Sequence, residues 1–596
     1  MSVYDVPSRL IRPTSMAPPG DSLRQTILSS LHRIYSERDL DDLTRYANVI
    51  FERLNKKSAS NSHNQEGWNE STSVLITYGD SIQLKDQKPL DALLNFYHQY
   101  LSDIFDVIHI LPFFPSGGDD GFSVISYEDV DASLGTWHNI SSISRSCRIM
   151  GDLVINHGSR KSEWFQQFLE DKSPGNRFFF TIDDGFDTTQ VVRPRDHTLI
   201  QKITTTGGEQ SIWCTFSEDQ VDYDFKNPDV LMYFINTVLD FIDRGVSIIR
   251  LDAVGFLWKE SGSSCLNLDQ THTIIKLIRL ICEQYSSHTV IVTETNLPNQ
   301  ENLSYFGNGN EAHWIYNFPL PPLILHTLLQ GNSDVLRRWA MSMPPALHGT
   351  AYLNFLSSHD GFGLRPIEGI LSDEEKQSLI TRLEKNGSLF TWRSSGGDTK
   401  KIYEANITLF SALKMTDDDE AGQHAIDRFI AAHAIMMSLE GIPAVYINSL
   451  IGCENNLIAV EATGIKRRIN REKFEKQVID ELLEENNSQQ AIVMRRINQI
   501  LSIRSKQPAF HPNATQFTLQ LGQSLFGVWR QSIDREQSIF AITNVTSKSI
   551  DLNIQDLNLI DIETWYDIQD GSSISETSEL INFKPYQSVW ISNKMF

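Results

Sequence analysis

The chain has 596 residues, of which 40% are hydrophobic and 10% aromatic, a composition typical of a large globular enzyme with a well-filled core. Its formal net charge of −23 argues against nucleic acid or an anionic membrane surface as a partner. The five cysteines are scattered without a C-x-x-C pair, which favours reduced thiols in a cytoplasmic protein over a disulfide framework or a zinc site. Residues 1–20 contain no apolar signal core and the chain has no run of 18 apolar residues, so we expect neither a secretory leader nor a membrane span.

Residues 1–70 are predicted to form an N-terminal arm followed by helices. The first 20 residues are rich in proline and serine, which is typical of a loose arm. Between Leu23 and Leu54 apolar residues recur at helical spacing, which predicts amphipathic helices. Residues 58–69 are mostly polar and are predicted to form a loop.

Residues 71–510 alternate strand-like apolar runs with helical segments, which predicts an α/β protein of the (β/α)8 TIM-barrel class. The eight strands are expected near Ser73–Tyr78, Val107–Leu111, Ile149–Ile155, Val246–Leu251, Thr289–Thr293, His313–Asn317, Tyr352–Leu356 and Pro443–Ile447. Two connections are too long for simple loops and predict inserted subdomains, at residues 158–226 and 361–416.

Residues 511–596 change to short alternating runs, which predict a C-terminal antiparallel β-sandwich. Its strands are expected at Gln516–Leu521, Leu525–Arg530, Ser538–Asn544, Ile550–Ile554 and Ser588–Ile591.

Four of the predicted barrel strands end in polar groups that can do chemistry. Arg250 and Asp252 lie on the same side of their strand, where the guanidinium can hold the carboxylate ionised. Taken alone, this R-x-D pair is more often a simple ion pair at a strand end. However, Glu294 closes the next strand, and the pairs Asn156-His157 and His359-Asp360 close two others. Carboxylates, imidazoles and an amide at the carboxyl ends of parallel strands indicate an active site on the top face of a barrel.

The motifs D-x-x-x-N-H, G-x-x-x-x-R-L-D-A, a strand-closing Glu and H-D occur in the order used by the α-amylase superfamily of retaining α-glucoside enzymes (glycoside hydrolase family 13), which the chain resembles. Within that superfamily it is most similar to the sucrose-phosphorylase group. The stretches that carry this likeness are Leu111–Pro115, Asp119–Phe122, Arg193–Arg195, Phe216–Asp222, Asn470-Arg471 and Lys584–Gln587.

A retaining enzyme needs an ionised carboxylate as nucleophile and a protonated acid for the leaving group. We assign these roles to Asp252 and Glu294, and expect Asp360 to favour the distorted sugar ring. The resemblance implies that Asp119, His157, His359, Gln220 and Arg471 bind the glucosyl unit, that Phe122 forms an apolar platform, and that Arg195 admits phosphate. It implies no metal or organic cofactor. The partners implied are a small sugar substrate and inorganic phosphate.

The acceptor is the open question. Tyr403-Glu404-Ala405-Asn406 resembles the acceptor-loop motif Y-x-x-N, but Lys400 and Lys401 stand where an acidic residue is expected. Two cations would favour an anionic leaving group such as fructose 6-phosphate or glycerate, although two loop lysines fit a solvated surface equally well. Arg365 adds a cation near the mouth of the site. The leading predicted donor is sucrose 6'-phosphate, with glucosylglycerate or plain sucrose as alternatives.

Two other functions remain open at this point. A hydrolase or transglucosidase of the same superfamily would share Asp252, Glu294 and Asp360 but would not depend on phosphate. A non-catalytic carbohydrate-binding protein on the same barrel would be expected to have lost one of these carboxylates, and all three are present. The protein is predicted to be a cytoplasmic monomer or homodimer.

Overall fold

The computed structural model describes residues 20–56, 67–394, 400–557, 564–574 and 580–596. Eight parallel strands close into a barrel in the order β1-β17-β13-β12-β11-β10-β4-β3. They are β1 Val74–Thr77, β3 Val107–Ile110, β4 Arg148–Val154, β10 Val246–Asp252, β11 Val290–Thr293, β12 Trp314–Tyr316, β13 Ala351–Phe355 and β17 Ile442–Tyr446. Each overlaps a strand predicted from the sequence, so the prediction of a TIM barrel is confirmed.

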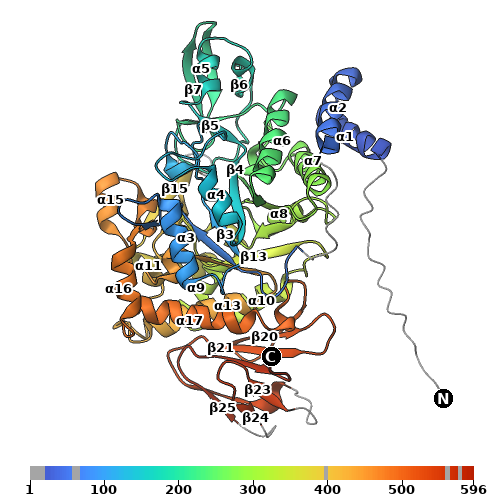
Figure 1. Cartoon of the computed structure of the whole chain (residues 1–596). Helices are drawn as coiled ribbons and strands as arrows, with labels where there is room; N and C mark the ends of the chain where they lie inside the picture. The colour runs from blue at the N-terminus through green and yellow to red at the C-terminus, as the bar shows by residue number, and fades with distance from the viewer. Residues whose placement is uncertain (1–19, 57–66, 395–399, 558–563, 575–579) are drawn as a thin grey trace, which may run out of the picture.

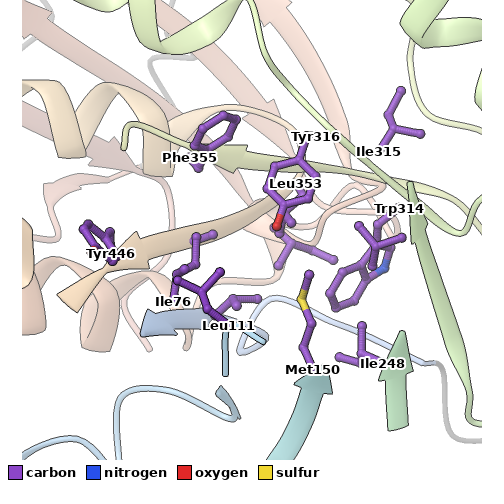
Figure 2. Packing of buried hydrophobic residues seen from close by; sticks show 14 of the residues in the cluster. Ile76, Leu111, Met150, Ile248, Trp314, Ile315, Tyr316, Leu353, Phe355 and Tyr446 are labelled. Carbon is purple, nitrogen blue, oxygen red and sulfur yellow. The ribbon is translucent and has the colours of Figure 1, made fainter. Parts of the chain in front are cut away.

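The barrel interior is filled by side chains from several strands and from the segments that follow them. Figure 2 shows Met150, Ile248, Trp314 and Leu353 pointing toward one another in this core. All four are fully buried. Burial on both faces of a parallel sheet explains why these strands read as continuous apolar runs rather than alternating ones.

Helices surround the barrel (Figure 1). The longest that cover it are α3 Pro89–Tyr100, α6 Pro228–Asp243, α7 Asp269–Tyr285, α9 Leu320–Gln330, α13 Ala425–Ser438 and α17 Gln489–Arg504. Shorter ones are α4 Trp137–Ser144, α10 Asp334–Ser342 and α16 Lys476–Glu484. Among the described helices none is long and apolar enough to cross a membrane.

Two helices precede the barrel, α1 Gly20–Ile34 and α2 Leu40–Lys56. They lie beside α6 and α7 (Figure 1). The Tyr46 hydroxyl donates to Asp229 at 2.8 Å, and Arg53 donates to Asn236 at 3.0 Å, which ties α2 to α6. The predicted arm at residues 1–19 and most of the predicted loop at 58–69 lie outside the described residues.

Both long connections contain structure of their own. The first holds β5 His157–Ser159, α5 Glu163–Leu169, β6 Thr181–Ile182, β7 Ile200–Thr205, β8 Gly208–Trp213 and β9 Gln220–Asp222. The second holds β14 Phe362–Gly363, the short 3-10 helix η5 Arg365–Ile367, α11 Asp373–Lys385, β15 Leu389–Ser394, β16 Lys400–Asn406 and α12 Leu409–Ala412. The boundaries that we drew for the two insertions remain predictions.

The C-terminal region consists of antiparallel sheets at the end of the molecule farthest from β5–β7 (Figure 1). Six strands form one sheet in the order β19-β20-β21-β26-β23-β24, and β22 pairs with β25. The predicted strands correspond to β19 Thr515–Thr518, β20 Leu525–Gln531, β21 Ser538–Asn544, β22 Ile550–Asn553 and β26 Ser588–Ser592. The strands β23 Trp565–Asp567, β24 Ser573–Ile574 and β25 Leu580–Phe583 were not predicted; β23 and β24, with three and two residues, are too short to show a clear alternation.

Candidate active site

The three predicted catalytic carboxylates line one pocket at the carboxyl ends of the barrel strands. Asp252 is the last residue of β10, Glu294 follows the end of β11, and Asp360 lies five residues beyond the end of β13. Parallel strands bring their carboxyl ends to the same edge, so three groups distant in sequence meet at one site.

Arg250 lies directly beneath Asp252. Its Nη1 is 2.8 Å from Asp252 Oδ1, and the same guanidinium contacts Asp152 on the neighbouring strand β4. The Asp152 carboxylate is also 2.7 Å from His109 on β3. All of these side chains are buried, so the arginine fixes the direction of Asp252 from below rather than reaching into the pocket.

Asp252 and Glu294 share a buried, low-dielectric environment. Burial raises the pKa of both carboxyl groups, and the Arg250 guanidinium opposes that rise. The hydrogen bond from Arg250 to Asp252 favours the negative charge on that carboxylate, and the two buried carboxyl groups oppose each other's ionisation.

Glu294 is held in place by the backbone of the β10 strand end. Its Oε2 accepts a hydrogen bond from the Ala253 N–H at 3.1 Å. Ala253 adopts a left-handed conformation with φ of 52°, which turns the chain immediately after Asp252. One backbone turn therefore positions the two carboxylates relative to each other.

One wall of the pocket presents groups suited to a sugar ring. The rings of Phe122 and His359 stack at 4.7 Å with an interplanar angle of 7°. Gln220 Nε2 lies 3.0 Å from His157 Nε2 and donates to Asp119 Oδ2 at 3.2 Å. All five residues line the pocket, and their binding of a glucosyl unit stays a prediction.

Burial sets the protonation of these groups. It lowers the pKa of His157 and lowers that of His359 to about 3, so both imidazoles are neutral near pH 7. Burial also disfavours the ionised form of Asp119, but Arg467 and Arg195 outweigh it and lower the Asp119 pKa. The wall thus offers neutral imidazoles and one anionic carboxylate to sugar hydroxyls.

Arg467 lines the pocket and was not singled out in the sequence. Its Nη1 is 2.5 Å from Asp360 Oδ1, and its guanidinium donates to both oxygens of the buried Glu404 at 2.9 and 3.1 Å. Although burial disfavours the Asp360 carboxylate, Arg467 lowers its pKa well below the ordinary range. The sequence signal that could have indicated Arg467 was the basic run Lys466-Arg467-Arg468, which comes just before the motif Asn470-Arg471.

Arg471, predicted to bind the glucosyl unit, lies behind the pocket. Its Nε donates to the His359 carbonyl at 2.8 Å, its Nη1 contacts Asp120, and its Nη2 is 3.9 Å from Asp360. It lines a neighbouring cavity instead. The contacts of Nε and Nη1 suit a group that positions His359, whereas the buried Nη2 has no hydrogen-bond partner in the described structure.

Residues of the two long connections also line the pocket. Arg195 and Tyr403 both line it, with the guanidinium carbon of Arg195 6.0 Å from the centre of the Tyr403 ring. The Lys401 side chain is exposed, and the part of the pocket lining that the structure describes does not include it. The Lys400 side chain lies outside the described residues.

No group of three or more His, Cys, Asp or Glu side chains within the described ranges is arranged to hold a metal ion. A closed barrel with a buried pair of carboxylates and a third acid at its carboxyl face is an arrangement suited to a glycoside-processing enzyme.

Comparison with known proteins agrees with this class. Residues 98–364 match the family description "Alpha amylase, catalytic domain". The chain is 40% identical to the glucosylglycerate phosphorylase of Allomeiothermus silvanus over 96% of its length and 98% of the relative's. It is 36% identical to the glucosylglycerate phosphorylase of Escherichia coli, over 96% of this chain and 100% of the relative's. The crystal structure of sucrose 6F-phosphate phosphorylase from Thermoanaerobacter thermosaccharolyticum superposes with a TM-score of 0.70 at 25% identity, covering 88% of this chain and 99% of that one.

The chain therefore belongs to the α-amylase family of glycoside-processing enzymes (glycoside hydrolase family 13), and within that family to the phosphorylases that transfer glycosyl groups.

Proposed function

We propose that the protein is a retaining glucosylglycerate phosphorylase, which moves the glucosyl group from glucosylglycerate to inorganic phosphate. The observation that carries this proposal is the likeness of 40% over 96% of the chain to an enzyme of that name. A sucrose 6(F)-phosphate phosphorylase is 28% identical over 73% of the chain. The comparisons thus favour glucosylglycerate, our alternative donor, over sucrose 6'-phosphate, our leading one.

In the first step, Asp252 attacks the anomeric carbon while Glu294 protonates the glycosidic oxygen. The C–O bond to glycerate breaks, glycerate leaves with the Glu294 proton, and a covalent β-glucosyl-enzyme forms on Asp252. The contact of 2.8 Å between Arg250 and Asp252 supports this role for Asp252. The hydrogen bond from Ala253 to Glu294 orients the acid toward the leaving group.

In the second step, a phosphate oxygen attacks the same carbon from the side that glycerate has left. Glu294, now ionised, accepts the proton of the attacking phosphate hydroxyl, the bond to Asp252 breaks, and α-glucose 1-phosphate leaves. Both α-glucose 1-phosphate, which is a dianion, and glycerate, which is a monoanion, need cations on this side of the pocket. Arg195, which lines the pocket above Tyr403, is our candidate for phosphate.

A second candidate is phosphorolysis of sucrose 6'-phosphate. The structural likeness to a sucrose 6F-phosphate phosphorylase, with a TM-score of 0.70, favours it. It uses the same three carboxylates and also releases an anionic acceptor, so only the acceptor distinguishes the two proposals.

The experiment is the reverse reaction. The enzyme is incubated with α-glucose 1-phosphate and, in separate samples, D-glycerate, fructose 6-phosphate, fructose, glycerol or no acceptor, and phosphate release is followed. The highest kcat/KM with glycerate supports the proposal, and the highest with fructose 6-phosphate supports the second candidate. Release without an acceptor, matched by free glucose, would instead indicate a hydrolase and overturn both.

A further inference from the structure

Two consecutive aspartates in the segment after β3 have different surroundings. Asp119 lines the main pocket, where Gln220 donates to its Oδ2 at 3.2 Å. Asp120 is not among the described residues that line this pocket and instead lines the cavity behind it, together with Arg468 and Arg471. The first aspartate can therefore reach a sugar in the main pocket, whereas the second acts on the substrate only through other residues.

The backbone at these two aspartates is held in an uncommon conformation. Asp119 and Asp120 have φ of 49° and 48°, in the left-handed region that residues other than glycine seldom adopt. Gly121 follows with φ of 108°, and a Cβ added there would lie 2.8 Å from the carbonyl oxygen of Pro112. A strained turn of this kind persists only when its surroundings hold it in place.

The Asp120 carboxylate is a point at which this turn is held. One of its oxygens accepts a hydrogen bond from Arg468 and the other from Arg471, 348 and 351 residues further along the chain. Arg468 belongs to the 3-10 helix η6 Lys466–Asn470, and Arg471 follows it directly. The buried Arg471 also donates from Nε to the His359 carbonyl at 2.8 Å. Since each carboxylate oxygen has a guanidinium of its own, both the position and the rotation of the group are fixed.

We propose that Asp120 is a positioning residue for Asp119. Its ion pairs with the two arginines hold the left-handed turn that directs the Asp119 carboxylate into the pocket. This inference rests on the proposed function, in which Asp119 binds the glucosyl unit. A sugar that enters meets a carboxylate already fixed in place, so less ordering is required on binding. Because every transfer passes through the same glucosyl unit, Asp120 affects all acceptors alike.

The test uses substitutions that suit a left-handed backbone and therefore add no strain. The amide of Asp120→Asn has a single accepting oxygen and cannot offer one to each arginine, and Asp120→Gly removes the side chain altogether. We measure kcat/KM for α-glucose 1-phosphate with D-glycerate and, separately, with glycerol. Both variants should lose roughly 10- to 100-fold, the range for a misplaced binding group, by the same factor for the two acceptors. The control Asp86→Asn makes the same change at an exposed aspartate with φ of 65° and should keep wild-type activity.

A double variant separates positioning from general damage to the fold. If Asp120 acts by holding Asp119, then Asp120→Asn should cost less than about twofold once Asp119→Ala is already present, because the group to be positioned is gone. Losses that multiply in the double variant would overturn the inference, since Asp120 would then support another part of the wall or the fold in general.

Three further results would contradict the inference: Asp120→Asn as active as Asp86→Asn, a loss confined to one acceptor, or wild-type activity in Asp119→Ala. The wild-type acceptor panel tests the proposed function separately. A wild type that prefers fructose would contradict glycerate as the acceptor, and the effect of Asp120→Asn would then be measured with fructose.

Discussion

The proposed glucosyl side of the pocket is built largely at the ends of barrel strands, with Gln220 of β9 added from the first insertion, whereas the proposed acceptor side comes from the two insertions. On the glucosyl side, Asp252 ends a barrel strand and is held by Arg250, and a stacked pair, Phe122 and His359, forms the wall. On the acceptor side, Arg195 comes from the first insertion, and Arg365 and Tyr403 come from the second.

This difference separates chemistry from specificity. Barrel strands are locked by hydrogen bonds to neighbours on both sides, so the carboxylates at their ends keep one geometry. The insertions lie at the carboxyl ends of those strands, where loops commonly vary and carry the residues that select a ligand. We therefore expect substitutions on the glucosyl side to affect every reaction of the enzyme, and those on the acceptor side to affect the choice of partner.

The largest effect is expected for Asp252→Asn, which removes the proposed nucleophile. An amide cannot form the glucosyl-enzyme, so kcat should fall by roughly 10⁴-fold or more with every acceptor. The measurement is phosphate release from α-glucose 1-phosphate, together with mass spectrometry of the quenched enzyme for the covalent adduct. The exposed Asp103→Asn is the control and should keep wild-type activity. A variant Asp252→Asn that still accumulates the adduct would refute the assignment.

The next largest effect is expected for Glu294→Gln, and it should depend on the leaving group. Glycerate needs a proton to leave, so its transfer should slow by roughly 10²- to 10⁴-fold, whereas fluoride leaves from α-glucosyl fluoride without one. Because the Glu294 pKa is raised, the wild type should lose activity on glucosylglycerate as pH rises through that raised value. When α-glucosyl fluoride is the donor, the first step catalysed by Glu294→Gln should show no such loss of activity at alkaline pH. Equal slowing on both donors would contradict the role.

The strand ends show why part of this site could be predicted from the sequence. A buried strand reads as an apolar run, and the polar residue that ends it is visible because it breaks the run, as at Asp252 and Glu294. The motifs at 119–122 and 216–222 added further residues of the wall. These residues converge because the barrel brings the ends of its strands together. The alternation of strands and helices in the sequence also predicts this fold class.

Arg467 and Arg365 show what the sequence did not reveal. Arg467 contacts Asp360 and Glu404 across 107 and 63 residues, so its role depends on how the second insertion folds back over the barrel. Arg365 was visible as a cation, but its place beside Glu294 follows from the pairing of β14 with β16. Contacts between residues so far apart in the chain produce no periodic pattern or fixed spacing in the sequence that could predict them.

A smaller loss is expected for Arg467→Met, roughly 10- to 100-fold in kcat/KM at neutral pH, because it leaves the buried Asp360 and Glu404 carboxylates without their shared partner. Arg467 now lowers the pKa of Asp360, so its removal should raise that pKa. Activity that requires ionised Asp360 is lost as pH falls through this pKa, and the acid limb of the pH profile should therefore move to higher pH. Arg467→Lys keeps the charge and should show a smaller displacement. An unmoved acid limb would show that Arg467 does not control Asp360.

The smallest effect is expected for Lys401→Gln, which tests the sequence-based prediction of the acceptor site against the structural one. If Lys401 selected an anionic acceptor, this change would reduce the preference for glycerate over glycerol by roughly 10-fold or more. Its exposed side chain lies two residues before Tyr403 on β16, outside the described lining of the pocket, so we expect a change of less than about twofold at 0.15 M salt. A larger effect that fades when salt is raised would indicate long-range attraction of the anion by Lys401 rather than binding. A large effect that persists would instead indicate that the β15–β16 hairpin binds the anion. Measuring Lys401→Gln at low and high salt thus decides whether the β15–β16 hairpin recognises the acceptor.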